Sequence, residues 1–429
     1  MHAHSRPGIW QRIRPNAATS KPAVLVVTHT PPLPAASGGA IYIANTLLPL
    51  SMEYALHLLI VGDEDMLPQI ETNAELYDRY FYSVTLARRE SPGESVFGKI
   101  SYYGKRILLG MPFLDMNCCS GAVVSAAREI ISTFSIAFME LHTAHLAFMK
   151  RIFPNLPAVL VGHNIESELF PFGLSDSDPV LKKVVAFFSR RNARRVEREN
   201  VWGIETMTFI SPADMAKVTT TESKVHLPLT FPAVPHVRNA PDGICRILWM
   251  GGFWWWPNAE GMEWFIQDVL PHIRDALWSD ASVLHIVGGN PTPAIQAAHD
   301  GKNIYVHGFV KDLAPLLAQT DFMIVPLLSG GGVRVKIIEA MSRGLPVLST
   351  SKGCEGLEAV HGESIWIADG AEEFGEALLT LARDGTLREK LSDGALRYIE
   401  EFHDHEKAVA LKRSIYAELA QMGHGEGSR

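Results

Sequence analysis

The chain has 429 residues, of which 47% are apolar and 20% are charged, and its formal net charge is −8. This composition is typical of a globular protein of about two or three domains, and it excludes a fibrous or largely disordered chain. The negative charge argues against a general nucleic-acid partner, and the sequence has no run of about 18 apolar residues that would predict a membrane-spanning helix.

Residues 1–20 contain basic side chains but lack the apolar segment of a secretory signal, so we expect a flexible tail and a cytoplasmic protein. Residues 21–235 then predict a first α/β domain. It opens with an apolar run, a loop with two glycines, a helix and a second apolar run, at 23–27, 28–40, 41–50 and 55–61. Further strands are expected at 82–86, 136–141, 158–161 and 207–210. Short buried runs of this kind are typical of a parallel sheet covered on both faces.

The proline-rich stretch 227–243 interrupts the pattern and is the best candidate for a linker. The alternation of strands and helices restarts in residues 244–400, which predict a second α/β domain. Its strands are expected at 247–250, 283–287, 304–306, 322–326 and 346–350, and a long helix at 259–277. Residues 401–422 predict a C-terminal helix and 423–429 a polar tail. The expected fold is therefore two doubly wound domains with a cleft between them.

The stretch LLSGGGVRVKIIEAM, residues 327–341, places a glycine run between a buried strand and a helix. Such a loop lies at the carboxyl edge of a parallel sheet, where ligands of open α/β sheets bind. Glycine lets an anion reach the free N–H groups of the helix, and Arg334 and Lys336 add positive charge at that end. The pattern favours a bound diphosphate. The alternative is a tight turn in which Lys336 pairs with Glu339.

Further motifs follow in the second half: GGFWWWPNAEGMEWFIQDVLPHI, LHIVGG, VHGFVKDLAPLLAQTDFMIVPL and GGGVRVKIIEAMSRGLPVLSTSKGCEGL. With them the sequence resembles the retaining GT-B glycosyltransferases of family 4, specifically over residues 244–400. In the first half only THTPPLPAASGGA, GHNIES and FISPADM match. The resemblance implies two Rossmann-like domains facing across a cleft, with the C-terminal helix returning to the first domain.

The resemblance also implies roles for individual residues. The cations Arg334 and Lys336 would contact the diphosphate of a nucleotide sugar, with Gly331 and Gly332 beside them, and Glu339 would accept hydrogen bonds from the ribose. The glycine loop of the first domain, Gly38 and Gly39, would approach the same phosphates. His163 matches a family histidine near the donor sugar and the reaction centre, so the catalytic set is His163, Arg334 and Lys336.

Polar residues at two strand ends of the first half add an acceptor-side hypothesis for Glu140, His142 and Asn164. Two positions depart from the family. Gly331 stands where many members have a glutamate, and Asn258 lies in a segment where many have an arginine and a lysine. The expected activity is retaining transfer of a sugar to an acceptor hydroxyl in polysaccharide or glycoconjugate synthesis. The nucleotide sugar is a substrate, and we expect no cofactor and no metal.

Two alternatives to this activity remain open. The motif DED at 63–65 resembles the metal-binding motif of GT-A transferases, and the chain could be a GT-B-like binding protein without catalysis. GESVFGKI at 93–100 nearly fits a P-loop but ends in isoleucine, which has no hydroxyl for magnesium. The basic segment 182–199 fits either a solvated helix or a peripheral contact with the inner membrane face, which would suit a lipid-linked acceptor as well as a glycan or other hydroxyl acceptor.

Overall fold

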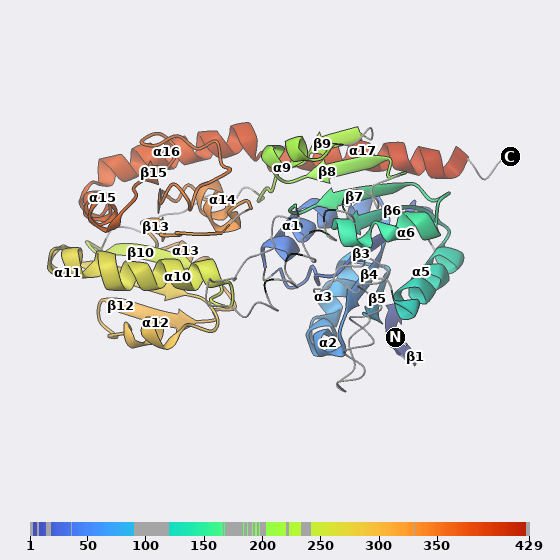
Figure 1. The fold of residues 1–429 in the computed structure, drawn as a ribbon, viewed down its shortest axis with the longest axis horizontal. Helices are drawn as coiled ribbons and strands as arrows, with labels where there is room; N and C mark the ends of the chain where they lie inside the picture. The colour runs from blue at the N-terminus through green and yellow to red at the C-terminus, as the bar shows by residue number, and fades with distance from the viewer. Residues whose placement is uncertain are drawn as a thin grey trace. The chain divides into compact units, whose positions relative to one another are not determined.

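The computed structural model describes residues 3–6, 8–13, 19–35, 37–89, 120–165, 203–219, 223–232, 242–330 and 332–425, and the single positions 167, 183, 187, 191, 194 and 197. The chain divides into two compact units, each with its own sheet (Figure 1). The first domain combines Met1–Pro228 with Lys407–Arg429, and the second spans Leu229–Glu406. Within the described residues, no helix has both the length and the apolar character needed to cross a bilayer.

The sheet of the first domain has the strand order β1-β2-β5-β4-β3-β6-β7-β8-β9. From β5 to β9 neighbouring strands are parallel, and the order reverses between β3 and β6. This reversal is the switch point at which doubly wound folds bind ligands. The strands are β1 (Ala3–Arg6), β2 (Ile9–Ile13), β3 (Ala23–Thr28), β4 (Ala55–Gly62), β5 (Ser83–Arg88), β6 (Ile136–His142), β7 (Ala158–Gly162), β8 (Thr206–Phe209) and β9 (Ser223–His226).

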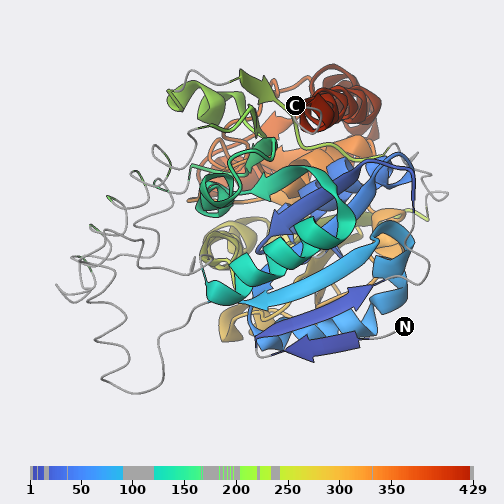
Figure 2. The same ribbon diagram turned by 90° about the vertical axis from the view of Figure 1, so that its right-hand side faces the viewer.

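Helices cover both faces of this sheet, because successive side chains of a strand point to opposite sides. In β3, Val24 and Val26 pack with α1 (Gly38–Leu47), α3 (Ala74–Tyr80) and α17 (His405–Gly425). Leu25 and Val27 pack on the other side with α5 (Gly121–Phe134), which crosses that face in Figure 2. The expected return of the C-terminal helix to the first domain is confirmed. The shorter helices are η1 (Leu48–Met52), α2 (Leu67–Thr72), η2 (Glu64–Met66), η3 (Ala144–Leu146), α6 (Phe148–Ile152) and α9 (Pro212–Lys217).

The expected N-terminal tail is wrong for residues 9–13. These residues form β2, which pairs antiparallel with β5, and β1 pairs antiparallel with β2. Trp10 explains the docking, because its ring is 9% exposed and belongs to the core of the first domain. Arg12 also forms a two-pronged ion pair with Asp78 of α3, at 3.0 and 2.7 Å. A buried indole and a bidentate pair together fix the strand at the sheet's edge.

The second domain repeats the same topology. Its sheet is parallel throughout, in the order β12-β11-β10-β13-β14-β15, with the reversal between β10 and β13. The strands are β10 (Cys245–Met250), β11 (Ser282–Val287), β12 (Ile304–Gly308), β13 (Phe322–Val325), β14 (Val347–Ser349) and β15 (Trp366–Ile367). The helices are α10 (Trp256–Trp264), the π-turn η4 (Phe265–Val269), α11 (Leu270–Ser279), α12 (Pro293–Ala297), α13 (Ala314–Leu317), α14 (Val335–Ser342), α15 (Ala371–Arg383) and α16 (Gly385–Phe402).

The long helix expected at 259–277 is interrupted. The segment consists of α10, η4 and α11, and Pro271 lies in the first turn of α11. Proline has no N–H to donate and its ring crowds the carbonyl one turn back, so the chain widens into a π-turn before the helix resumes. The C-terminal region is also divided differently from the prediction, because α16 ends at Phe402 and α17 extends to Gly425.

Candidate functional site

The glycine loop of the second domain follows β13, directly at the reversal of strand order. Gly330 and Gly332 have φ of +100° and +77°, a backbone region that other residues adopt only with strain. Gly331 lies outside the described residues. The loop leads into α14, whose N-cap is Arg334. The chain thus presents the N-terminal end of a helix at the switch point, where N–H groups have no partner within the helix.

Lys336 occupies the first turn of α14 and is held on three sides. Its ammonium donates a hydrogen bond to Asn258 Oδ1 at 2.8 Å and lies 4.7 Å from the centre of the buried Trp249 ring. A Cβ on Gly251 would lie only 2.6 Å from Lys336 Nζ, so any larger residue there would displace the ammonium. Burial, and then the charge of Arg334, lowers the pKa of Lys336 to about 7. An ammonium in these surroundings gains from a bound anion.

Arg334 lies on the other side of the same helix end. Its side chain reaches the carbonyl oxygens of Ser329 and Lys352, both at 3.5 Å, and the residue is 6% exposed. Burial lowers the pKa of Arg334, although Glu355 nearby opposes that shift. Two cations therefore lie close enough at one helix terminus for the charge of Arg334 to act on Lys336. Like charges placed together with the helix dipole favour an anionic ligand.

One sequence-based expectation about this loop is resolved by the contacts. The alternative pairing of Lys336 with Glu339 is wrong, because Lys336 bonds Asn258, and Glu339 pairs with Arg343 at 3.5 Å. Asn258 Nδ2 in turn donates to the carbonyl of Gly252 at 2.8 Å, so this side chain links α10 to the end of β10. Burial raises the pKa of Glu339, and Arg343 counteracts it.

A second polar cluster lies at the switch point of the first domain. Gly38 and Gly39 open α1, and the side chain of Ser37 caps the helix by accepting from the N–H of Ala40 at 3.3 Å. His163 follows β7 and is half-buried. A Cβ on Gly39 would lie 3.9 Å from His163 Nδ1, so the structure brings this histidine against the first turn of α1.

His163 is the outer end of a chain of hydrogen bonds. His163 Nε2 lies 2.9 Å from His142 Nδ1, and His142 Nε2 lies 2.8 Å from Glu140 Oε1. Glu140 also accepts from Lys412 Nζ at 2.9 Å and from the hydroxyl of Tyr416 at 2.7 Å. Three elements contribute to this chain: β6, the end of β7, and α17.

The charges in this chain are balanced inside the protein. Burial alone would raise the pKa of Glu140, but Lys412 and the hydrogen bond from His142 hold it well below its usual range. Burial lowers the pKa of His142, against the opposing effect of Glu140, and lowers that of His163 further. The cluster therefore holds one ion pair, Lys412 and Glu140, and two neutral imidazoles near pH 7.

The prediction that Glu140 and His142 contact the acceptor is wrong, because both side chains are 0% exposed. They lie at the carboxyl end of β6, where His142 bonds His163. Asn164 follows His163 in the same loop and is half-buried.

Sequence reasoning missed several members of the first-domain cluster. His29 follows β3 and His145 lies in η3, and burial lowers the pKa of both imidazoles to about 4. A histidine directly after a fully buried strand was a usable signal for His29. Lys412 and Tyr416 gave no local signal, because their partner Glu140 lies 272 and 276 residues away.

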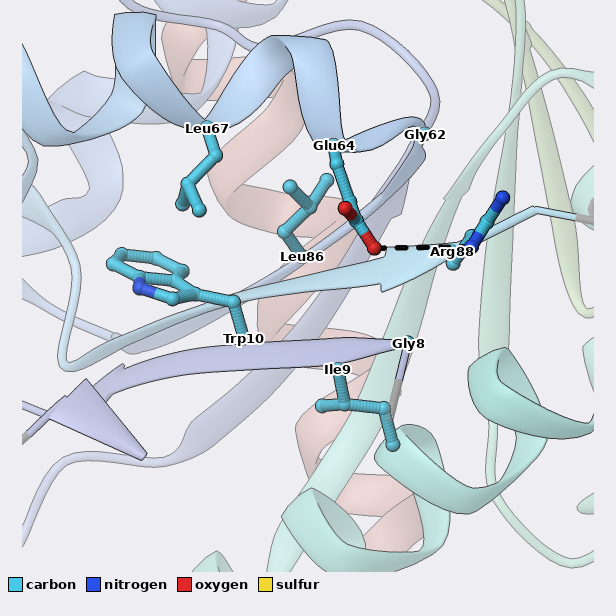
Figure 3. Close-up of a pocket in the computed structure, with 8 residues that line it drawn as sticks. All are labelled: Gly8, Ile9, Trp10, Gly62, Glu64, Leu67, Leu86 and Arg88. Carbon is cyan, nitrogen blue, oxygen red and sulfur yellow. Dashed lines mark ion pairs between the residues drawn. The ribbon is translucent and has the colours of Figure 1, made fainter. Parts of the chain in front are cut away.

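A pocket opens where β4 and β5 end and β2 begins (Figure 3). Its lining combines apolar side chains, including Trp10 and Leu86, with an ion pair between Glu64 and Arg88 at 3.8 Å. Asp63, the first member of the DED motif, accepts two hydrogen bonds from Arg89. Two of the three DED carboxylates are thus paired with arginines. The P-loop-like stretch 93–100 and most of the basic segment 182–199 lie outside the described residues.

Comparison with known proteins identifies similarities in sequence and in fold. Residues 245–384 match the family model "Glycosyl transferases group 1". The chain is similar to an uncharacterized 44.6 kDa protein in the cps region of Klebsiella pneumoniae, with 22% identity over 92% of this chain and 99% of that protein.

Two solved structures illustrate the likeness in fold. Sucrose-phosphate synthase from Thermosynechococcus elongatus superposes with a TM-score of 0.62 and 14% identity, covering 93% of this chain and 99% of that one. HepE from Anabaena, solved in complex with UDP and glucose, has a TM-score of 0.59 and 14% identity over 93% and 99% of the two chains. Two Rossmann-like domains and these structural neighbours identify the fold as GT-B, and the family match identifies residues 245–384 as a glycosyltransferase group 1 domain.

Proposed function

We propose that the chain is a retaining glycosyltransferase that takes a sugar from a nucleotide-sugar donor and binds the donor diphosphate at the start of α14. One observation carries the proposal: Arg334 and Lys336 converge at a helix N-terminus that follows two glycines with positive φ. Retention of anomeric configuration rests on the family resemblance. HepE, solved with UDP and glucose, supports a nucleoside diphosphate as the leaving group.

The chemistry follows from where charge develops. When the bond between the sugar and the diphosphate breaks, negative charge grows on the leaving phosphate. Arg334, Lys336 and the N–H groups of the α14 terminus would stabilise that charge without reorganising, which is the main electrostatic contribution of a preorganised site. Glu339, one turn further along α14, would accept hydrogen bonds from the ribose. Gly38 and Gly39 would approach the phosphates, as the resemblance implies.

His163 would bind a sugar hydroxyl near the reaction centre, because it is the accessible end of the histidine chain. The acceptor would be a hydroxyl of a glycan, a lipid-linked carrier or another glycoconjugate. Polysaccharide or glycoconjugate synthesis is the role we propose for this transfer. A peripheral contact with the inner membrane face through segment 182–199 belongs to the same proposal, as does a cytoplasmic location.

The reaction would need no divalent metal, because protein cations and helix N–H groups neutralise the leaving diphosphate. We therefore expect turnover to be unchanged in excess EDTA. Loss of turnover in EDTA, restored by manganese, would instead point to the DED motif at 63–65 as a metal site.

The decisive experiment combines binding and turnover on the purified full chain. A panel of nucleoside diphosphates is screened for a rise in the thermal midpoint, since a ligand that binds only the folded state stabilises it. Arg334→Ala and Lys336→Ala are then assayed for sugar transfer with the donor identified in this way. Each variant should raise the barrier by roughly 2–4 kcal/mol.

Arg383→Ala is the matched control, because Arg383 makes an exposed ion pair with Asp280 in the same domain at 2.7 Å. It should keep wild-type turnover. Wild-type turnover in either site variant would refute the diphosphate assignment. The anomeric configuration of the product, read by NMR before it mutarotates, tests retention separately.

A further inference from the structure

The hydrogen-bonded side chains behind His163 lead to a buried ion pair between β6 and α17. Lys412 and Tyr416 are one turn apart on α17, and both donate to Glu140 of β6. Lys412 is 3% exposed and also reaches Thr46 Oγ1 of α1 at 3.3 Å. A buried ion pair costs desolvation free energy and is weak evidence of added stability, so a role beyond packing is worth seeking.

The hydrogen-bond directions in this chain follow from elementary chemistry. An ionised carboxylate can only accept, so His142 Nε2 must carry the proton shared with Glu140. A neutral imidazole with a proton on Nε2 has a lone pair on Nδ1, and His142 Nδ1 therefore accepts from His163 Nε2. His163 is left with its lone pair on Nδ1, the nitrogen that faces the first turn of α1.

Lys412 weakens the effect of the Glu140 carboxylate on the pKa values of His142 and His163. A carboxylate bonded to a histidine normally favours the imidazolium form. Here the ammonium of Lys412, 2.9 Å from the same Glu140 oxygen that meets His142, opposes that effect. The carboxylate orients His142, while burial, assisted by the charge of Lys412, outweighs its tendency to promote protonation of the two rings.

We propose that Glu140, His142 and Lys412 are positioning residues that hold His163 neutral, with its proton on Nε2, so that Nδ1 accepts a hydrogen bond from a sugar hydroxyl. This inference rests on the proposed function, which places a sugar at His163. It adds a task for α17: the C-terminal helix sets the protonation state of a residue at the site. Tyr416 assists by donating to the second oxygen of Glu140.

Other titratable groups also face these rings. They are His29 after β3 and Tyr42 on α1, whose ring meets His163 edge to face at 5.2 Å between centres, and His29 acts in turn on His145 in η3. The charge of Arg89 acts on His29. The two histidines are held neutral by burial, and Tyr42 donates to the carbonyl of Leu227 at 3.2 Å. In the hydrogen bonds of the described residues given above, Glu140 is the one carboxylate that contacts His142 or His163.

The direct test needs no substitution in the protein that is measured. The full chain is labelled with ¹⁵N-histidine, and the ring nitrogen shifts of His163 are followed between about pH 6 and pH 8. The signal is assigned by its absence in His163→Asn. We expect a neutral ring with the proton on Nε2 throughout. A proton on Nδ1, or an imidazolium near pH 7, would overturn the proposal whether or not the chain transfers sugar.

Kinetics then test the part played by Lys412. Wild-type kcat/KM should show no ionisation of His163 between about pH 6 and pH 8. Lys412→Met leaves the charge of Glu140 uncompensated, so protonation of the imidazole pair becomes easier and kcat/KM should fall as the pH is lowered. Glu140→Gln/Lys412→Met removes both charges while a glutamine oxygen can still accept from His142, and it should restore the wild-type profile below about pH 7.

Tyr416→Phe keeps the ion pair and the shape of the ring, so it serves if Lys412→Met does not fold. It should shift the profile in the same direction by a smaller amount. A folded Lys412→Met or Tyr416→Phe protein with the wild-type profile would refute the role of α17. A wild-type protein that has the expected tautomer but transfers no sugar would instead contradict the proposed function and leave the positioning chain intact.

Discussion

At the scale of single residues, Lys336 shows how burial prepares a cation for a ligand. Its ammonium meets an amide oxygen and an aromatic face, but no carboxylate contact is described for it. These partners compensate only part of the lost hydration, which is why the pKa of Lys336 falls to about 7. A phosphate would supply the missing negative charge.

The pKa of Lys336 leads to a prediction about pH. In the free protein Lys336 loses its proton above about pH 7, whereas a bound diphosphate requires the ammonium and raises its pKa. Binding above pH 7 must therefore take up a proton, and the affinity should fall by about tenfold per pH unit, while below pH 7 it should level off. Calorimetry in buffers of different ionisation enthalpy should detect close to one proton bound at pH 8. Lys336→Met should bind more weakly and take up none; equal uptake in this variant would contradict the assignment.

Gly251 makes a second residue-scale prediction. Its φ is +156°, and a Cβ would lie 2.6 Å from Lys336 Nζ and 2.9 Å from Asn258 Nδ2. Gly251→Ala should displace the ammonium by a large part of an ångström and reduce turnover by roughly 100-fold. Gly356→Ala is the control for backbone strain alone, because Gly356 has φ +84° and open space around its Cβ position. Similar turnover in the two variants would show that Lys336 is not held in place by this contact.

At the scale of elements, β2 extends the first sheet beyond its parallel core. It adds an antiparallel strand next to β5 and contributes Trp10 both to the core and to the wall of the pocket in Figure 3. A strand of five residues with one large buried side chain depends heavily on that side chain.

Trp10→Ala should therefore destabilise the first domain by roughly 3–5 kcal/mol. Urea unfolding followed by circular dichroism measures the change. The control is Trp254→Ala, because Trp254 is 70% exposed and its removal should cost about 0.5 kcal/mol or less. If the two variants unfolded alike, residues 9–13 would be the tail that the sequence predicts.

Buried parallel strands were readily predicted from the sequence, because they read as unbroken apolar runs. The run at 55–61 became β4 and the run at 136–141 became β6, each within a residue of its expected bounds. β2 escaped because Trp10 stands among polar and basic neighbours, as an edge strand permits. In the candidate site, the spacing of Arg334 and Lys336 after the glycine loop singles them out in the sequence. The ion pair of Glu140 with Lys412 was not predictable, since only the folded chain brings β6 and α17 together.

At the scale of the whole molecule, the two domains differ in the number of chain segments that build them. The chain leaves the first domain at Pro228 and returns at Lys407, so the second domain is one uninterrupted segment and the first is completed by α17. α17 contributes Val409, Ile415 and Leu419 to the core of the first domain, together with Lys412 and Tyr416, which donate to Glu140. The second domain contains Asn258, Arg334 and Lys336, and both of its hydrophobic clusters are built from its own residues.

This difference predicts the behaviour of fragments. Residues 229–406 should fold alone and bind the nucleoside diphosphate that stabilises the full chain, with an affinity that depends on Lys336. Residues 1–228 lack α17, so Glu140 would be buried without Lys412 or Tyr416; removing one partner of a buried ion pair costs roughly 3–5 kcal/mol, a large part of a domain's stability. This fragment should be unfolded or aggregate until a peptide of residues 405–425 is supplied.

Circular dichroism and calorimetric titration of each fragment measure folding and binding. The proposal would be wrong if a folded fragment 229–406 did not bind the nucleotide while the first domain, completed by the peptide, did. The diphosphate site would then lie in the first domain.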